Sequence, residues 1–256
     1  MRGFLSVLVL VCLVSCNRQS QTPDARLTPD IDGVSMVAKK TIDVEVLKIF
    51  KPSHIIVRGA QEVRQLDVDD EVIEQPRSEI QAVDGGVMLD GVFVRDGLRV
   101  TPLESRLRIS VHVDSVTDAR ASKIERTYEG TLRVQSVKGV LRLIITMDFE
   151  SYVAGVLAAE LPSGPRESRR AQSIVIRTYG LHRDGRHTLS DVCDLTHCQV
   201  FKDHGDSKDI EVVRSTQGLV LSAYGELAHG FYSSTCGGRT AEYLEVWPGV
   251  ASTHGP

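Results

Sequence analysis

The hydrophobic pattern of this chain changes near residue 146, and the change limits the folds open to it. Before that point, short runs alternate apolar and polar residues, as in TIDVEV from residue 41. Alternation with a period of two places the apolar side chains on one face of a strand. After that point, apolar residues recur three and four positions apart, the spacing of one helix face. The sequence therefore predicts an α+β fold with a β-rich N-terminal portion.

Two helices are expected directly after the strands. Asp148 is a suitable N-cap for the first helix, whose apolar face includes residues 152–157. Pro162 ends this helix just after Glu160, because proline cannot continue a helix. A second helix starts near Pro165, a residue favoured in the first turn.

The segment after these helices is expected to carry a short third helix around residues 208–215. A hairpin is expected next, within GLVLSAYGELAHGFYSS, with Gly225 in its turn.

Glu160 is an acidic residue in the run AELP, at the apolar end of the first predicted helix. The preceding letters GVLAA place mostly hydrocarbon beside it, and desolvation disfavours an ionised carboxylate. We therefore expect the pKa of Glu160 to rise toward the range useful to a general acid. The alternative is a solvated glutamate at a helix end.

Composition excludes several classes of function. The chain has 256 residues, enough for one large or two small domains, and its formal net charge is -4. A global basic footprint is absent, so a nucleic acid is not an expected partner. The sequence contains no GxSxG nucleophile elbow and no GxxxxGK[ST] phosphate-binding loop.

The N-terminus predicts export. Residues 4–14 form an apolar stretch that is too short for a permanent transmembrane helix and has the length of a signal-peptide core. The following letters LVSC resemble the lipobox of bacterial lipoproteins, which implies a signal peptide over residues 1–16 and a lipid anchor on Cys16. The alternative is an ordinary cleaved signal peptide. Residues 17–40 are expected to be a flexible tether that connects a membrane anchor to a domain facing the cell wall or periplasm.

The segment HTLSDVCDLTHC carries two imidazoles and two thiols within twelve residues. His187, Cys193, His197 and Cys198 match the ligand set of a Cys2His2 zinc site, and we expect a structural Zn²⁺ there. The alternative is a disulfide between Cys193 and Cys198, which an exported compartment favours. In either case, Cys236 is expected to be a buried or a reactive thiol.

Two further segments suit sugar binding. Gln199 and Phe201 place a side-chain amide near an aromatic ring, and sugars are bound by such pairs through hydroxyl and C–H contacts. The run YSSTCGG, which includes Ser234, is expected to end a strand in a tight turn that exposes hydroxyls and N–H groups. Each signal is weak by itself, and the second is also typical of a purely structural turn.

Four segments follow one another along the second half of the chain: ESYVAGVLAAELPSGPRESRRAQSIVIRTYGL, DVCDLTHCQVF, TQGLVLSAYGELAHGFYSSTCGG and EYLEVW. In this order they resemble the SpoIID/LytB family of cell-wall proteins, over roughly residues 128 to 247. The family includes lytic transglycosylases that cleave glycan strands stripped of stem peptides, and enhancers of a cell-wall amidase. The resemblance implies a catalytic region over residues 128–256, and the alternating pattern predicts a separate β-rich portion over residues 41–127. This chain ends at Pro256, soon after Trp247, where family members commonly continue, so the catalytic region is expected to be shortened.

The resemblance also implies roles for single residues. Glu160 falls on the catalytic glutamate, and the cysteine and histidine loop falls on a zinc-binding loop of some members. Substrate contacts are expected from Arg177, Tyr179, Gln199 and Ser234.

The implied reaction is a peptidoglycan lytic transglycosylation. Glu160 protonates the leaving GlcNAc oxygen and then accepts the proton of the MurNAc C6 hydroxyl as a 1,6-anhydro ring closes. The alternative function is a non-catalytic protein that binds peptidoglycan and stimulates a cell-wall amidase.

Overall fold

The computed structural model describes residues 40–66, 72–104, 106–111, 124–182, 187–203, 205–223, 226–239, 241 and 243–246. The predicted signal peptide with Cys16, the tether up to residue 39, Gly225 and Trp247 lie outside the described residues. Among the helices of the described part, none combines the length and the apolar character needed to cross a membrane.

The described chain is an α+β structure, as predicted, with most strands before the helices. The strands are β1 (Thr41–Val46), β2 (His54–Gln65), β3 (Val72–Val83), β4 (Gly86–Leu89), β5 (Val92–Arg95), β6 (Leu98–Pro102), β7 (Arg106–Val111), β8 (Ile124–Glu129), β9 (Thr131–Val137), β10 (Val140–Asp148), β11 (Val192–Cys193), β12 (Ser222–Ala223) and β13 (Glu226–Leu227). The helices are η1 (Lys48–Phe50), α1 (Phe149–Glu160), α2 (Arg166–Leu181), α3 (Ser207–Arg214) and α4 (Tyr243–Val246).

Strands β1 to β11 form one sheet. Its main path runs β11-β1-β10-β9-β6-β2-β3-β4-β5, and β7 branches from β2 and pairs with β8. All pairs are antiparallel except β1 with β11. The long strand β2 serves two neighbours because it bends between Arg58 and Gln61, where Gly59 has a φ of 125°. That backbone angle favours glycine, and the bend lets β7 pair with the first half of β2 and β6 with the second half.

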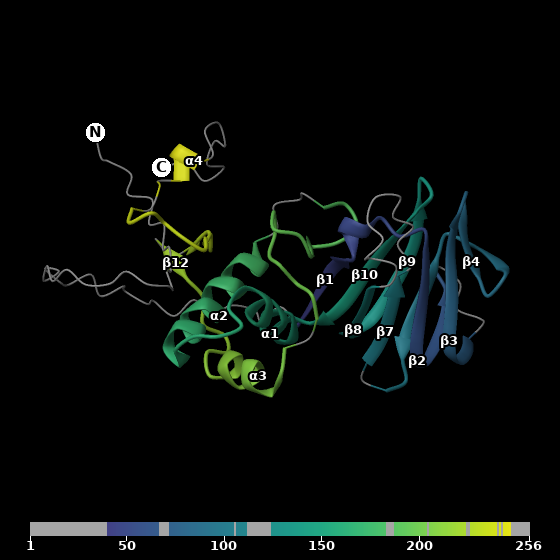
Figure 1. Ribbon diagram of the computed structural model, residues 1–256, viewed down its shortest axis with the longest axis horizontal. Helices are drawn as coiled ribbons and strands as arrows, with labels where there is room; N and C mark the ends of the chain where they lie inside the picture. The colour runs from purple at the N-terminus through teal and green to yellow at the C-terminus, as the bar shows by residue number, and fades with distance from the viewer. Residues whose placement is uncertain are drawn as a thin grey trace, which may run out of the picture.

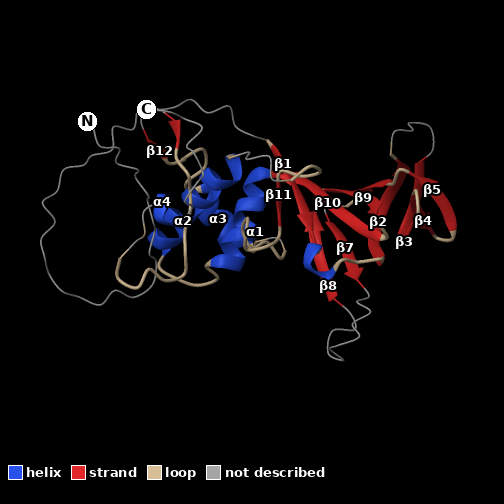
Figure 2. Ribbon diagram, turned by 90° about the horizontal axis from the view of Figure 1, so that it is seen from above, coloured by secondary structure: helices blue, strands red, loops and turns tan. Residues whose placement is uncertain are grey.

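The helices gather at the β1 and β10 end of the sheet, away from β4 and β5 (Figures 1 and 2). Helix α1 starts where β10 ends, and the Asp148 side chain caps it by accepting the Ser151 N–H at 2.9 Å. Helix α1 then packs against both α2 and α3. Its buried residues join those of the sheet in one apolar core, so the helical layer and the sheet stabilise each other.

The predicted helices and hairpin are present. Helix α1 ends at Glu160, α2 follows Pro165, and α3 occupies the predicted position with a capping box at Asp206. Strands β12 and β13 form the predicted hairpin.

The division expected at residue 127 falls inside β8, and the sheet continues through β10 to Asp148. The change from strands to helices, predicted near residue 146, lies at Asp148.

A buried ion pair joins β1 to β10. The Glu45 side chain is 1% exposed and binds both Arg142 and Lys48. Burial alone would raise the pKa of Glu45, but the hydrogen bonds from Arg142 and Lys48 outweigh it and lower that pKa. Because the folded pKa is depressed, this stabilisation is present above the unfolded pKa of about 4.3 and is lost as the pH falls through the folded pKa.

We predict that Arg142→Met lowers the free energy of unfolding by about 3 kcal/mol at pH 7, because it leaves a buried carboxylate without its main partner. Urea denaturation at pH 7 and pH 3 measures this effect, and the difference from wild type should shrink at pH 3. Arg99→Met, at an exposed position of β6, is the matched control. Equal losses in the two variants would contradict the role of the pair.

Candidate functional site

Glu160 is the last residue of α1, and its carboxylate is bound by a distant loop. The Val200 N–H donates to Glu160 Oε1 at 2.8 Å. The loop reaches this position because residues 201–203 pack directly against Gly155 in α1. A side chain at position 155 would collide with the Phe201 ring and the Asp203 carbonyl. The glycine thus permits the close approach that brings Val200 to Glu160.

Gln199 lies beneath this contact and is only 1% exposed. Its Oε1 accepts the Tyr152 hydroxyl at 3.0 Å, and its Nε2 lies 3.4 Å from the Tyr232 hydroxyl. Phe201 is also buried, where its ring packs near Tyr128 and Tyr152. Such burial does not suit the expected sugar-binding pair of Gln199 and Phe201, because a sugar could not reach either side chain. Gln199 instead organises the groups behind Glu160.

Tyr232 is a functional candidate that the sequence analysis missed. Its hydroxyl interacts with the Glu160 carboxylate and with Gln199. Burial raises the pKa of Tyr232, and the negative charge of Glu160 raises it further. The phenol is therefore neutral at physiological pH. Tyr232 opens the run YSSTCGG, in which only the smaller hydroxyl side chains were expected to face a ligand.

Arg177 has a structural position that corrects its expected role in substrate binding. The guanidinium is 2% exposed and forms two hydrogen bonds with the Glu150 carboxylate, at 2.8 and 2.7 Å. It also donates to the carbonyls of Val213 and Leu219. These contacts join α1, α2, α3 and the segment after α3, and the bidentate pair explains why an arginine occupies this site.

The two other predicted substrate residues lie in different settings. Tyr179 is largely buried, and its hydroxyl donates to the His197 carbonyl at 3.2 Å. Ser234 is exposed, two residues after Tyr232. The structure thus connects Tyr179 to the cysteine and histidine loop, and it leaves Ser234 accessible to a ligand.

The four predicted metal ligands converge. One donor atom from each of His187, Cys193, His197 and Cys198 lies within 4.8 Å of the others. His187 Nε2 is 3.1 Å from Cys198 Sγ, and His197 Nε2 is 3.4 Å from Cys193 Sγ. Two thiolates and two imidazoles are a donor set that Zn²⁺ accepts, so these residues fit a structural zinc site. The cysteines are free thiols in the structure, without the alternative disulfide.

The two thiols of this cluster have pKa values shifted in opposite directions. The hydrogen bond from Cys193 lowers the pKa of the Cys198 thiol, and His187 adds to the effect. The same hydrogen bond, together with burial, raises the pKa of Cys193. Cys198 is therefore the thiol that ionises first, which is the form that binds a metal.

The loop that carries the cluster is bound to the sheet. Strand β11, which ends at Cys193, pairs in parallel with β1. On either side of this pairing, the Asp191 carboxylate accepts the Asp43 N–H at 3.0 Å and the Asp194 carboxylate accepts the Leu47 N–H at 2.6 Å. Burial raises the pKa of Asp194 to about 6. The pairing with β1 and these two hydrogen bonds therefore fix the cysteine and histidine loop to the edge of the sheet.

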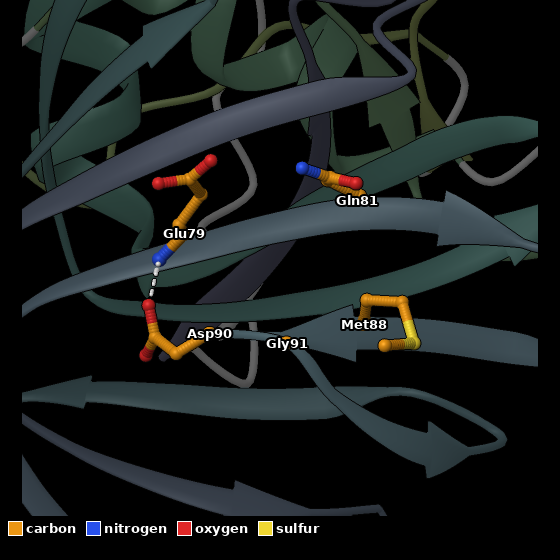
Figure 3. Close-up of a pocket in the computed structure, with 5 residues that line it drawn as sticks. All are labelled: Glu79, Gln81, Met88, Asp90 and Gly91. Carbon is orange, nitrogen blue, oxygen red and sulfur yellow. Dashed lines mark hydrogen bonds between the residues drawn. The ribbon is translucent and has the colours of Figure 1, made fainter.

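A separate depression of about 420 Å³ lies over β3 and β4, at the other end of the sheet from α1 (Figure 3). Glu79 and Asp90 line it, together with Gln81, Met88 and Gly91. Its two carboxylates are already bound: Glu79 pairs with Arg77 and His54, and Asp90 accepts the Glu79 N–H at 2.9 Å. These carboxylates bind other groups of the sheet and its turns, so the surroundings of Glu160 are the stronger candidate site.

We predict that Gly155→Ala destabilises the protein and disturbs Glu160. Alanine would gain about 1 kcal/mol from helix propensity, but overpacking against the Asp203 backbone costs about 1–3 kcal/mol. Thermal melting should show a net loss. Gly180→Ala in α2 is the matched control, because its added methyl meets the Phe149 ring at 3.0 Å rather than a backbone carbonyl. A Gly155→Ala protein as stable as the Gly180→Ala protein would contradict the close approach.

Comparison with known proteins places the candidate site within a recognised region. The family model described as SpoIID, stage II sporulation protein, matches residues 137–223, which include Glu160 and the cysteine and histidine cluster. Tyr232 and Ser234 follow the end of this match.

Two curated proteins are similar to parts of the chain. The Amidase enhancer of Bacillus subtilis (strain 168) is 36% identical over 95 residues, which are 36% of this chain and 13% of that protein. An uncharacterized protein of Brachyspira hyodysenteriae is 28% identical over 130 residues, which are 48% of this chain and 35% of that protein. The chain thus spans a minor part of either relative. No solved structure matches it.

Proposed function

Because residues 137–223 of this chain belong to the SpoIID family, we propose that the protein acts on the bacterial cell wall as a peptidoglycan lytic transglycosylase. The family resemblance predicted from the sequence is confirmed. The activity is our inference, and the single observation that carries it is the position of Glu160. Its carboxylate ends α1 and is held by a backbone N–H and a neutral phenol.

This arrangement suits cleavage by one carboxylate. Glycosidases that use water generally need two carboxyl groups, one as acid and one as nucleophile or base. In the proposed reaction, protonated Glu160 gives its proton to the bridging oxygen as the bond from MurNAc C1 to that oxygen breaks. The resulting carboxylate removes the proton of the MurNAc C6 hydroxyl, and O6 forms the new bond to C1. Glu160 is thereby protonated again, and no water is consumed.

The intramolecular attack replaces a second protein group. The C6 hydroxyl belongs to the same sugar as C1, so its effective concentration at the reaction centre is high. The protein then needs to orient one carboxylate and hold the sugar. Ser234, exposed near Tyr232, is our candidate for a contact with glycan hydroxyls.

We propose that the cysteine and histidine cluster holds a structural Zn²⁺. Four protein ligands leave no open coordination position, so the ion would stabilise the loop rather than activate water. The loop continues directly into Gln199 and Val200, which contact the groups around Glu160. Its stability therefore bears on the geometry of the carboxylate.

The substrate of this reaction lies outside the cytoplasm. The expected export and the expected lipid anchor at Cys16 would bring the domain to it, and both remain proposals.

We predict that Glu160→Gln abolishes release of glycan fragments with 1,6-anhydro-MurNAc ends, because glutamine keeps the shape but cannot transfer the proton. The assay is mass spectrometry of products from peptide-free glycan strands treated with the chain lacking its predicted signal peptide. Glu167→Gln, at an exposed glutamate of α2, is the matched control and should keep full activity. Equal turnover by wild type and Glu160→Gln would rule out the catalytic assignment.

We predict one bound Zn²⁺ per chain and a lower melting temperature after chelation, since the cluster closes the loop on itself. Elemental analysis and thermal melting measure the two effects. Cys193→Ser should lose the metal, whereas Cys236→Ser should keep it. Zinc retained in Cys193→Ser, or a melting temperature indifferent to chelation, would contradict the proposal.

A second candidate function is a non-catalytic enhancer of a cell-wall amidase. The observation that favours it is the similarity to the Bacillus subtilis protein named Amidase enhancer. Under this function, the purified protein would bind peptidoglycan and raise the rate of an added amidase. Wild type and Glu160→Gln would do so equally, and no anhydro products would appear.

A further inference from the structure

A line of hydrogen-bonding groups leads from the buried side chains of Tyr152 and Gln199, through half-buried Tyr232, to Glu160. The Tyr152 hydroxyl donates to Gln199 Oε1 at 3.0 Å. Gln199 Nε2 faces the Tyr232 hydroxyl at 3.4 Å, and that hydroxyl interacts with the Glu160 carboxylate. These four side chains come from α1, from the segment after the cysteine and histidine cluster, and from the segment after β13.

The line has a direction. Gln199 Oε1 accepts from Tyr152, so its Nε2 must face the other way, toward the Tyr232 oxygen and the Ile176 carbonyl. An amide nitrogen can only donate, and Tyr232 therefore accepts from Gln199. The Tyr232 proton is then left for Glu160. Each group donates toward the carboxylate, and such chains polarise one another in a direction that favours negative charge at the end.

The surroundings of the two tyrosines keep their hydroxyl groups protonated. Burial raises the pKa of both Tyr152 and Tyr232, so the two phenols retain their protons. The other titratable groups that act on these tyrosines are Tyr179 from α2 and the thiols of Cys193 and Cys198 from the metal loop.

We propose that Tyr232 is the positioning residue for Glu160: its hydroxyl orients the carboxylate and stabilises its charged form between the two proton transfers. This inference rests on the proposed transglycosylase function. Tyr232 and the Val200 N–H approach Glu160 from two different segments, so together they fix the carboxylate more firmly than either contact would. A hydrogen bond to a charged group is also stronger than a neutral one. Tyr232 would thus help the half of the reaction in which Glu160 acts as an acid, because it stabilises the carboxylate that remains after Glu160 has given up its proton.

The test compares Tyr232→Phe with wild type by two measurements. The first is a pH titration of the protein labelled with ¹³C at glutamate carboxyls, with the Glu160 signal identified by its loss in Glu160→Gln. Removing a donor to the charged form should raise the Glu160 midpoint by about one pH unit. The second is turnover on peptide-free glycan strands. There kcat should fall about tenfold or more, KM should change little, and the alkaline limb of the pH profile should move upward.

Tyr128→Phe is the matched control. Tyr128 is more deeply buried than Tyr232 and stacks on Phe201, but it has no place in the line of donors. This variant should keep the wild-type midpoint, kcat and pH profile. If Tyr232→Phe behaves like Tyr128→Phe in both measurements, the positioning role is refuted.

The two measurements also separate the inference from the proposed function. If wild type shows no turnover, the transglycosylase function fails, and the titration alone then decides whether Tyr232 stabilises the Glu160 carboxylate. If Tyr232→Phe does not fold, Gln199→Met removes the amide that directs Tyr232 while keeping a similar volume. A raised Glu160 midpoint in Gln199→Met supports the role, and an unchanged midpoint overturns it.

Discussion

The hydrogen bond from the Val200 N–H to Glu160 Oε1 joins the end of α1 to a loop forty residues further along the chain. The rest of the proposed site depends on this contact, because it orients the carboxylate that we propose for proton transfer. The contact requires α1 to start in the right place and the loop to hold its shape. Both conditions are met by the same edge of the sheet.

A closed ring of contacts connects these elements. Helix α1 continues from β10, which pairs with β1, and β1 in turn pairs with β11. Strand β11 leads into the cysteine and histidine cluster, and the cluster leads into Gln199 and Val200 beside Glu160. The buried pair of Glu45 and Arg142 joins two strands of this ring. A disturbance in the sheet edge would therefore reach Glu160 without any change in the site itself.

The sequence predicted the local parts of this arrangement well. Asp148 as a cap, Pro162 as a stop and the four converging donors rest on short-range rules of capping, proline geometry and ligand spacing. The change from strands to helices, predicted near residue 146, lies at Asp148, where the pairing of β10 with β1 ends. Arg177 and Gln199 were assigned to substrate because residue type gives no measure of burial. Tyr232 was missed because its partner Glu160 lies 72 positions away in the sequence.

The central claim is that Glu160, held by Val200 and Tyr232, lies at the glycosidic bond that is cleaved. A crystal structure of Glu160→Gln with a bound peptide-free oligomer of alternating GlcNAc and MurNAc tests this claim most directly. We expect the bridging oxygen within hydrogen-bond distance, about 3 Å, of the side chain at position 160. A glycan bound with its bridging oxygens away from that side chain, or on another face of the molecule, would contradict the account.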